Sequence, residues 1–319
     1  MSQQTDYPLS EVPTSARRGL LSISLVLLGF TFFTATMWAG GTLGAAFPFG
    51  ELLVVITIGN LLLGSYAAAL GFIAYKSGLN TLLMGRFCFG EKGSKLSDFI
   101  LGFTQIGWYA WGTATIAIVL VKTTGISSAF EIPLMIFFGL AFCVTAMVGY
   151  KGLEILSRVA VPLMMLFILF SLYTGMVDVG GLSGLTEMTA SGDMSFAAGI
   201  TVVIGTFVSG GTQATNWSRF AKSGKIAVLA TMAAFFVGNG LMVLTGALGS
   251  LIYQQADIVD VMIAQGFVVL AVLMLFFNIW TTQDNTIYNF AAAGCNLIRT
   301  EKRKVLTVVG AAIGTVLAV

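Results

Sequence analysis

The sequence predicts an all-α integral membrane protein whose helices form two inverted halves. Of its 319 residues, 57% are hydrophobic and 9% are charged, and the mean hydropathy is +0.92. Soluble domains, by contrast, carry about 25% charged residues. Apolar runs of about 20 residues recur along the chain, and each is long enough to cross a bilayer as a helix. Two of these runs carry a matching interruption but enter the membrane from opposite sides, which indicates the inverted halves.

The apolar runs define the expected elements in chain order. We predict helices at residues 19–47, 51–76, 95–121, 131–150, 152–174, 195–219, 225–252 and 260–292. A ninth helix begins near Val305, and the basic stretch 79–93 is expected to lie at the inner surface. The chain ends about 15 residues into the ninth helix, too few to cross a core ~30 Å thick. We therefore expect further helices in the natural protein.

The basic residues indicate how these helices are oriented. With the N-terminus inside, all of the 16 lysines and arginines except Lys122 fall on the inner side, as the positive-inside rule requires. Arg219 and Lys222, which follow the sixth helix, are interpreted as inner-surface anchors. The charge pattern therefore predicts a cytoplasmic N-terminus.

The inverted halves define the domain organisation. Residues 1–18 are expected to form a cytoplasmic N-terminal segment, and residues 19–319 are expected to form a single transmembrane domain. The first repeat covers residues 19–174 approximately, and the second covers residues 195–319. The second repeat is therefore incomplete, because the chain ends within the ninth helix.

The matching interruptions lie in the first and sixth helices. The first is Thr-Phe-Phe-Thr (31–34) and the second is Thr-Phe-Val-Ser (206–209), and a Gly-Gly pair follows each. In lipid an interruption leaves backbone groups unsatisfied at a high cost, unless those groups line a cavity. Paired interruptions in inverted halves indicate the midplane binding site of a secondary transporter. The alternative is that the small residues only allow close helix packing.

Polar residues in the eighth helix could supply a cation site. Asn278, Thr281 and Thr282 have i, i+3, i+4 spacing, which places them on one helix face. Carbonyls freed at the broken first helix, such as those of Gly29 and Phe32, could add further oxygen ligands for Na⁺. The alternative is that both threonines bond back to carbonyls of their own helix.

Three other residues could contact a substrate. Asp284 lies within an apolar span, where a carboxylate is costly and usually faces a cavity or a partner. It could bind substrate N–H donors, carry a proton or orient its neighbours. Gln105 and Trp108 share one face of the third helix. A carboxamide complements the edge of a lactam or amidine, and an indole offers a flat face for stacking. The alternative for this pair is packing at a helix interface.

The composition also argues against an enzyme. The chain contains no histidine, which is the commonest metal ligand and general base. Metal catalysis and a histidine-activated nucleophile are therefore not expected.

Several stretches of the chain together resemble the nucleobase–cation symporter family, and within it the bacterial cytosine permeases. The resemblance covers the chain from about residue 12, and the matching segments occur in the same order. The matching segments are "SARRGLLSISLVLLGFTFFTATMWAGGTLG" (15–44), "GNLLLG" (59–64), "TQIGWY" (104–109), "GTFVSGGT" (205–212), "VMIAQG" (261–266) and "NIWTTQDN" (278–285).

The resemblance implies a leucine-transporter-like fold, in which helices one to five and six to ten form inverted repeats and two helices follow. This chain would then lack helices ten to twelve. A base is expected to stack between Trp108 and Phe207. The other residues expected to contact the substrate are Phe33, Gln105, Thr206, Ser209 and Asp284. The expected Na⁺ ligands are the carbonyls of Gly29, Phe32 and Asn278 and the hydroxyls of Thr281 and Thr282.

The function implied by the resemblance is Na⁺-coupled import of a nucleobase, cytosine first, by alternating access. The expected setting is a monomer in the bacterial inner membrane that contacts lipid and a small-molecule substrate but no nucleic acid. Two positions depart from the family pattern, which has serine in place of Thr206 and asparagine in place of Gln283, so the pocket could be reshaped. The alternatives are an H⁺-coupled importer of a related heterocycle of the uracil, hydantoin or allantoin type, and a passive channel.

Overall fold

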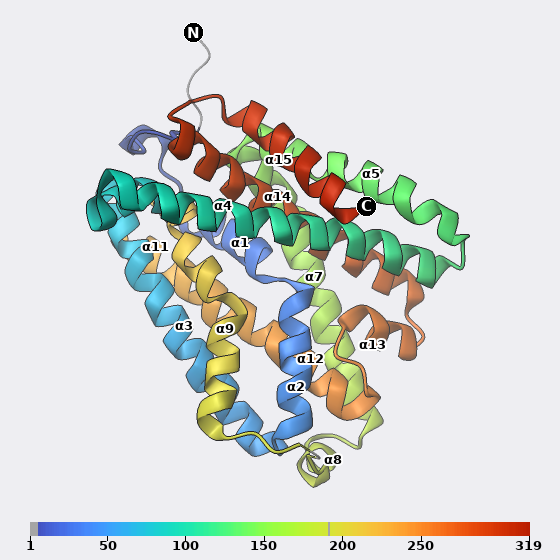
Figure 1. The fold of residues 1–319 in the computed structure, drawn as a ribbon. Helices are drawn as coiled ribbons and strands as arrows, with labels where there is room; N and C mark the ends of the chain where they lie inside the picture. The colour runs from blue at the N-terminus through green and yellow to red at the C-terminus, as the bar shows by residue number, and fades with distance from the viewer. Residues whose placement is uncertain (1–5, 191) are drawn as a thin grey trace.

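The computed structural model describes residues 6–190 and 192–319, which fold into helices joined by short connections. Two groups of helices cross each other, one running down the view and one lying across its top (Figure 1). The bundle group consists of α1 (Leu20–Thr31), α2 (Thr34–Ala46), α3 (Phe49–Ser77), α9 (Phe196–Gln213), α10 (Thr215–Ser218), α11 (Gly224–Met232), the π-helical turn η3 (Ala233–Gly238) and α12 (Asn239–Tyr253). The crossing group consists of α4 (Thr81–Thr124), α5 (Glu131–Ala141), α6 (Cys143–Val148), α14 (Val268–Ile298) and α15 (Arg303–Ala318).

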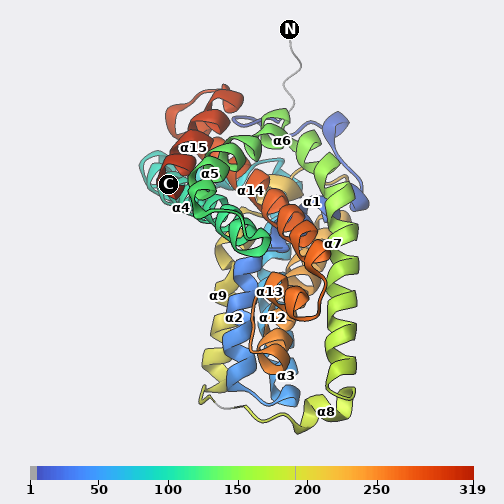
Figure 2. The same ribbon diagram turned by 90° about the vertical axis from the view of Figure 1, so that its right-hand side faces the viewer.

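Contacts within each group are extensive. In the bundle group α2 packs on α12 and α3 packs on α9, whereas in the crossing group α4 packs on both α14 and α15. Helix α7 (Tyr150–Asp178) runs along the molecule and contacts α1 and α12 of the bundle group and α14 of the crossing group (Figure 2). The remaining short elements are η1 (Thr14–Ala16), η2 (Ser128–Phe130), α8 (Leu182–Glu187) and α13 (Ile258–Ala264).

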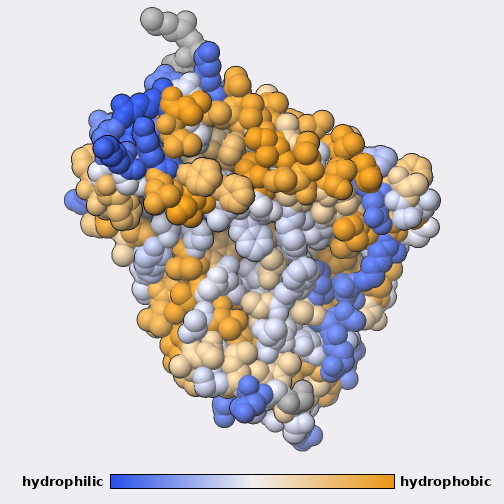
Figure 3. All heavy atoms as spheres, in the orientation of Figure 1, coloured by the Kyte–Doolittle hydropathy of each residue, from blue (hydrophilic) through white to orange (hydrophobic). Residues whose placement is uncertain are grey.

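The helices are those of a multi-pass membrane protein. Among the described residues six helices are long and apolar enough to cross a membrane, or seven if α1 and α2 count as one bent span. The predicted eighth and ninth helices, α14 and α15, are not among them, because polar residues interrupt α14 and α15 has only 16 residues. Apolar side chains cover much of the visible surface, whereas hydrophilic ones gather beside the N-terminus and at the opposite end (Figure 3).

The first predicted interruption is confirmed as a break between α1 and α2. The two helices meet at an angle of 61°, and Phe33 between them is extended, with φ −129° and ψ 123°. Asn278 of α14 satisfies the freed backbone groups. Its Oδ1 accepts hydrogen bonds from the N–H and hydroxyl of Thr34 at 3.1 and 2.7 Å, and its Nδ2 donates to the Phe32 carbonyl at 3.0 Å.

The second predicted interruption is confirmed as a kink within α9. Phe207 has φ −144° and ψ 16°, and the helix continues on both sides of it. The Thr206 hydroxyl donates to the Val203 carbonyl at 2.7 Å and accepts from Nδ2 of Asn239 at 2.9 Å. Asn239 also donates to Oδ1 of Asn60 in α3 at 2.8 Å, so neighbours within the bundle group hold this kink.

The predicted eighth helix, 260–292, is wrong at its start. The structure has the separate helix α13, and α14 begins at Val268 and continues to Ile298. Gly266 between them has φ +83°, a conformation that glycine adopts without the steric cost that other residues meet. The predicted seventh helix also differs from an ordinary α-helix, because the π-helical turn η3 lies between α11 and α12.

The N-terminal segment packs into the end of the molecule where the two groups meet. The Asp6 carboxylate forms a buried ion pair with Arg303 of α15 at 3.0 Å and accepts from the Tyr150 N–H at 2.8 Å. Arg219 donates to the backbone carbonyls of Asp6 and Tyr7 at 2.7 and 2.8 Å. The interpretation of Arg219 as an inner-surface anchor is therefore wrong, because its side chain is 1% exposed and binds the N-terminal segment.

Candidate substrate pocket and ion site

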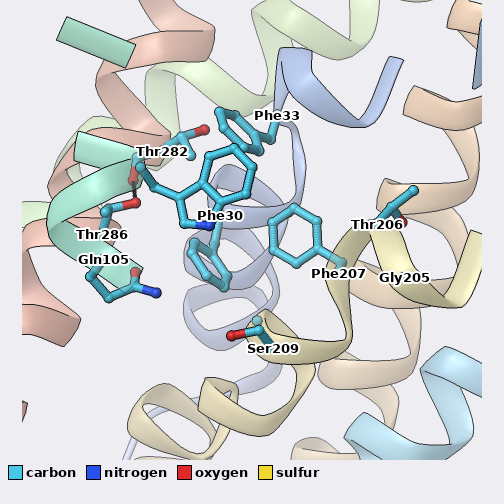
Figure 4. Close-up of a pocket in the computed structure, with 11 residues that line it drawn as sticks. Phe30, Phe33, Gln105, Gly205, Thr206, Phe207, Ser209, Thr282 and Thr286 are labelled. Atoms are coloured by element: carbon cyan, nitrogen blue, oxygen red, sulfur yellow. Dashed lines mark hydrogen bonds between the residues drawn. The ribbon is translucent and has the colours of Figure 1, made fainter. Parts of the chain in front are cut away.

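A cavity of about 90 Å³ lies between the break at Phe33 and the kink at Phe207 (Figure 4). By the measure in which one water needs roughly 10–15 Å³, this space is large enough for several waters or for a small ligand. Helices α1, α4, α9 and α14 contribute the walls. The lining residues are Phe30, Phe33, Gln105, Trp108, Gly205, Thr206, Phe207, Ser209, Gly210, Thr282 and Thr286.

Aromatic rings surround this cavity and meet edge to face. The ring centroids of Phe33 and Trp108 are 5.4 Å apart with an interplanar angle of 84°, and those of Phe33 and Phe207 are 6.3 Å apart at 89°. Phe30 meets Phe207 at 5.1 Å, also at 89°. Aromatic side chains bind planar ligands by stacking or by edge-to-face contact, so this lining is suited to a planar ring.

The pocket brings together six of the seven predicted substrate-contacting residues. They come from the break, from the third predicted helix and from the kink, and they are Phe33, Gln105, Trp108, Thr206, Phe207 and Ser209. Gln105 is buried, whereas Trp108 is 44% exposed. Among the lining residues that the prediction did not assign to the substrate are Phe30, three residues before Phe33, and Thr286, four residues after Thr282. Helical spacing from Thr282 to Thr286 was the available signal.

The structure does not place Asp284 in this pocket. Its side chain is buried against α6, where Oδ2 accepts a hydrogen bond from the Thr145 hydroxyl at 3.0 Å. Thr145 in turn accepts from the indole N–H of Trp280 at 3.3 Å. Asp284 therefore lies within the crossing group, on a different face of α14 from Thr282 and Thr286, which line the pocket.

Gln283, one of the two departures from the family pattern, also lies outside the pocket lining. Its Nε2 donates to the Tyr109 carbonyl at 2.8 Å and approaches that of Trp108 at 3.4 Å. A Cβ at Gly112 would overlap the Gln283 amide, so the side chain fills the space beside this glycine. Gln283 supports the segment of α4 that carries Trp108.

The predicted ion ligands gather where α14 meets the break. The Thr282 hydroxyl donates to the carbonyls of Phe32 at 3.2 Å and Asn278 at 2.9 Å, and the Thr281 hydroxyl donates to the Phe277 carbonyl at 2.8 Å. Both threonines thus bond back to their own helix, as the alternative interpretation expected. A hydroxyl has one proton and two lone pairs, so these bonds leave oxygen lone pairs for a cation.

A residue that the sequence did not reveal borders this cluster. A Cβ added at Gly29 would lie 2.8 Å from the Ser157 hydroxyl and 3.4 Å from the Cβ of Thr281, so the three residues meet. Ser157 of α7 is fully buried, and its hydroxyl has no hydrogen-bond partner in the described part of the chain. Nothing in the sequence distinguishes this serine from others in apolar helices.

The sequence matches the family described as permeases for cytosine/purines, uracil, thiamine and allantoin over residues 11–319. The chain belongs to this family. It is a permease, as the sequence predicted, and not an enzyme.

Within this family, the chain is similar to bacterial cytosine permeases. The permease chain is 42% identical over 318 residues to the cytosine permease of Escherichia coli (strain K12), a match that covers 100% of this chain and 75% of the relative. The cytosine permeases of Escherichia coli O6:H1 and O157:H7 match with the same identity and coverage. The resemblance to bacterial cytosine permeases of the nucleobase–cation symporter family is thereby confirmed.

Solved structures confirm the predicted fold class. The permease superposes on Mhp1, a nucleobase-cation-symport-1 family transporter, in a closed conformation with bromovinylhydantoin bound. That match has a TM-score of 0.85 and 17% identity, and covers 96% of this chain and 73% of Mhp1. The inward-facing conformation of Mhp1 matches with a TM-score of 0.80 and 16% identity, covering 96% and 71%. The predicted leucine-transporter-like arrangement with a broken first helix and a kinked sixth helix is therefore correct.

Proposed function

We propose that the protein is a symporter that imports cytosine together with Na⁺ by alternating access. The aromatic pocket supports a planar, single-ring substrate, and Gln105 at its wall carries both a donor and an acceptor for the edge of such a ring. The 42% identity to cytosine permeases supports cytosine among the possible heterocycles. The base would stack between Trp108 and Phe207.

The position of Thr282 is the observation that supports coupling between Na⁺ and substrate. This residue lines the substrate pocket, and its hydroxyl also bonds to the Phe32 carbonyl at the break. Na⁺ held by the predicted oxygens would therefore contact the same break that shapes the pocket wall at Phe33. A ligand that orders a shared element favours the conformation that the other ligand needs, and the coupling is reciprocal.

The same site explains how a bound ion would affect the motion of one helix group relative to the other. The carbonyls of Gly29 and Phe32 belong to α1 of the bundle group, whereas Asn278, Thr281 and Thr282 belong to α14 of the crossing group. An ion between them would draw the groups together on one side of the membrane. Secondary transporters of inverted-repeat type rock one group against the other around such a fixed site.

Uptake of radiolabelled cytosine into proteoliposomes tests this proposal. We expect an inward Na⁺ gradient to drive uptake, replacement of Na⁺ by K⁺ to remove it, and Na⁺ to tighten cytosine binding by roughly 5–150-fold. The double variant Thr281→Ala, Thr282→Val should lose the Na⁺ effect and keep weak binding. Uptake that follows a pH gradient instead would favour H⁺ coupling, and uptake that needs no gradient would favour a channel; either result overturns the proposal.

The orientation belongs to the same proposal, with the N-terminus in the cytoplasm of a bacterial cell. Arg17, Lys76 and Lys222 line one cavity near the N-terminal segment, as the positive-inside rule expects of an inner surface.

Cys88 is exposed, whereas Cys143 and Cys295 are buried. A membrane-impermeant maleimide should label Cys88 in inside-out vesicles but not in intact cells, and Cys88→Ser should remove the signal. Labelling in intact cells would reverse the orientation.

A further inference from the structure

The buried hydroxyl of Ser157 requires a physical explanation. A polar atom inside a protein without a hydrogen bond is costly, and such atoms commonly mark an ion, a water or a functional role. A serine within a helix can satisfy itself by donating to the carbonyl three or four residues earlier. Ser157 lies in α7 and makes no such bond in the described structure. Its oxygen instead lies against Gly29.

The direction of this oxygen is informative. Gly29 and Thr281 are two of the proposed Na⁺ ligands, and the added-Cβ geometry at Gly29 places the Ser157 hydroxyl and Thr281 beside the same glycine. The three residues come from α1, α7 and α14, which contact one another pairwise. The Ser157 hydroxyl, the Gly29 backbone and the Thr281 side chain therefore meet at one junction of three helices.

We infer that Ser157 is a further ligand of the coupling ion, supplied by α7 in addition to the ligands from α1 and α14. This inference rests on the proposed Na⁺ coupling. The Ser157 lone pairs would contact the cation, and its proton would point away from it. Hydroxyl oxygen is a hard ligand, and hard cations prefer oxygen to sulfur.

With Ser157 as a ligand, the ion would be bound by a third helix, α7, in addition to α1 and α14. Helix α7 contacts the bundle group through α1 and the crossing group through α14. An ion bound to all three helices would order α7 as well as the break, so that loss of Ser157 weakens ion binding without altering the pocket wall. Ser157 does not line the substrate pocket. Its variants should therefore change the Na⁺ dependence of binding more than the affinity for cytosine at saturating Na⁺.

Two variants of Ser157 distinguish the effect of losing the oxygen from the effect of losing side-chain volume. Ser157→Cys keeps nearly the same size but replaces a hard oxygen by a soft sulfur, and Ser157→Ala removes the polar atom. The matched control is Ser171→Ala, because Ser171 is also buried in α7 but already bonds Gln265 at 2.8 Å, far along the helix. Cytosine binding is titrated against Na⁺, and the rise in melting temperature with Na⁺ alone is measured as a readout that needs no transport.

We expect both Ser157 variants to raise the Na⁺ concentration for half-maximal effect by roughly tenfold, the size expected for one lost ligand interaction. Cytosine affinity at saturating Na⁺ should change less than twofold, and Ser171→Ala should leave the Na⁺ dependence unchanged. If Ser157→Ala does not fold, the cysteine variant carries the test. A wild-type Na⁺ response that persists unchanged in either folded variant overturns the role of Ser157 alone. A wild-type protein that ignores Na⁺ overturns both this role and the proposed coupling.

Discussion

The two interrupted helices differ in which neighbours hold them open. The break between α1 and α2 is satisfied by Asn278 from the crossing group, which bonds the backbone on both sides of it. The kink in α9 is held by Thr206 and, behind it, by Asn239 from the same bundle group. Among the described hydrogen bonds of residues 31–34 and 206–209, only those of the first interruption link the two groups. The sequence pattern is similar in the two helices, but the link between the groups depends on a side chain more than 240 positions away.

The glycine pairs that follow the interruptions also act differently. A Cβ at Gly40 would overlap the Val243 carbonyl, so this glycine lets α2 approach α12 closely, as the close-packing alternative expected. A Cβ at Gly210 would instead overlap the ring of Phe207. The first pair thus serves helix packing, whereas the second leaves room for a pocket-lining aromatic ring.

The largest expected effect comes from the side chain that links the groups. Asn278→Leu removes the acceptor of the Thr34 N–H and hydroxyl and one of the two donors to the Phe32 carbonyl, and each buried polar group left unpaired costs about 1–3 kcal/mol. We expect a clear fall in melting temperature and loss of both Na⁺ and cytosine binding, measured by thermal unfolding and calorimetry. Asn278→Asp keeps the acceptor for Thr34. Its melting temperature and binding affinities should lie between those of wild type and Asn278→Leu. Wild-type binding in Asn278→Leu would contradict the assigned role.

A smaller effect is expected from crowding the packing glycine. Gly40→Ala forces α2 away from α12, and overpacking of this kind typically costs about 1–3 kcal/mol. The melting temperature should fall, and Gly50→Ala provides the control because a Cβ there meets nothing within 4 Å. Equal melting temperatures for the two variants would show that the close approach of α2 and α12 contributes little.

The smallest effect should come from the neighbour that holds the kink. Asn239→Leu removes the hydrogen bonds to Thr206 and Asn60, each worth about 0.5–1.5 kcal/mol, and leaves the break between α1 and α2 intact. We expect cytosine to bind several-fold more weakly while the midpoint for Na⁺ stays as in wild type, as measured by calorimetry. A parallel loss of Na⁺ affinity would mean that the kink, like the break, links the two groups.

Much of the fold could be predicted because its signals are local. Apolar runs located most of the helices, and the Thr-Phe pattern located both interruptions, since hydroxyls and glycines weaken a helix near their own position. The start of the eighth helix was misplaced although Gly266 was a visible signal. A continuous apolar run does not by itself show where one helix ends and the next begins.

The site was less predictable because its partners are distant in sequence. Spacing placed Thr281 and Thr282 on one face, but it could not show that Ser157 from α7 meets Gly29. The same limit applied to Asp284, which was expected at the substrate and lies against Thr145 instead. A polar residue in an apolar helix indicates that a partner is required. The identity of that partner depends on tertiary packing.

The N-terminal segment has a consequence for how one end of the molecule opens. Asp6 is held by Arg303 of the crossing group and, through its carbonyl, by Arg219 of the bundle group. The segment therefore joins the two groups at this end as a ligand tethered to its own binding site would. Any state in which α10 and α15 separate must first release this internal peptide from one arginine or the other. Its occupancy then shifts the balance between conformations as an external ligand would.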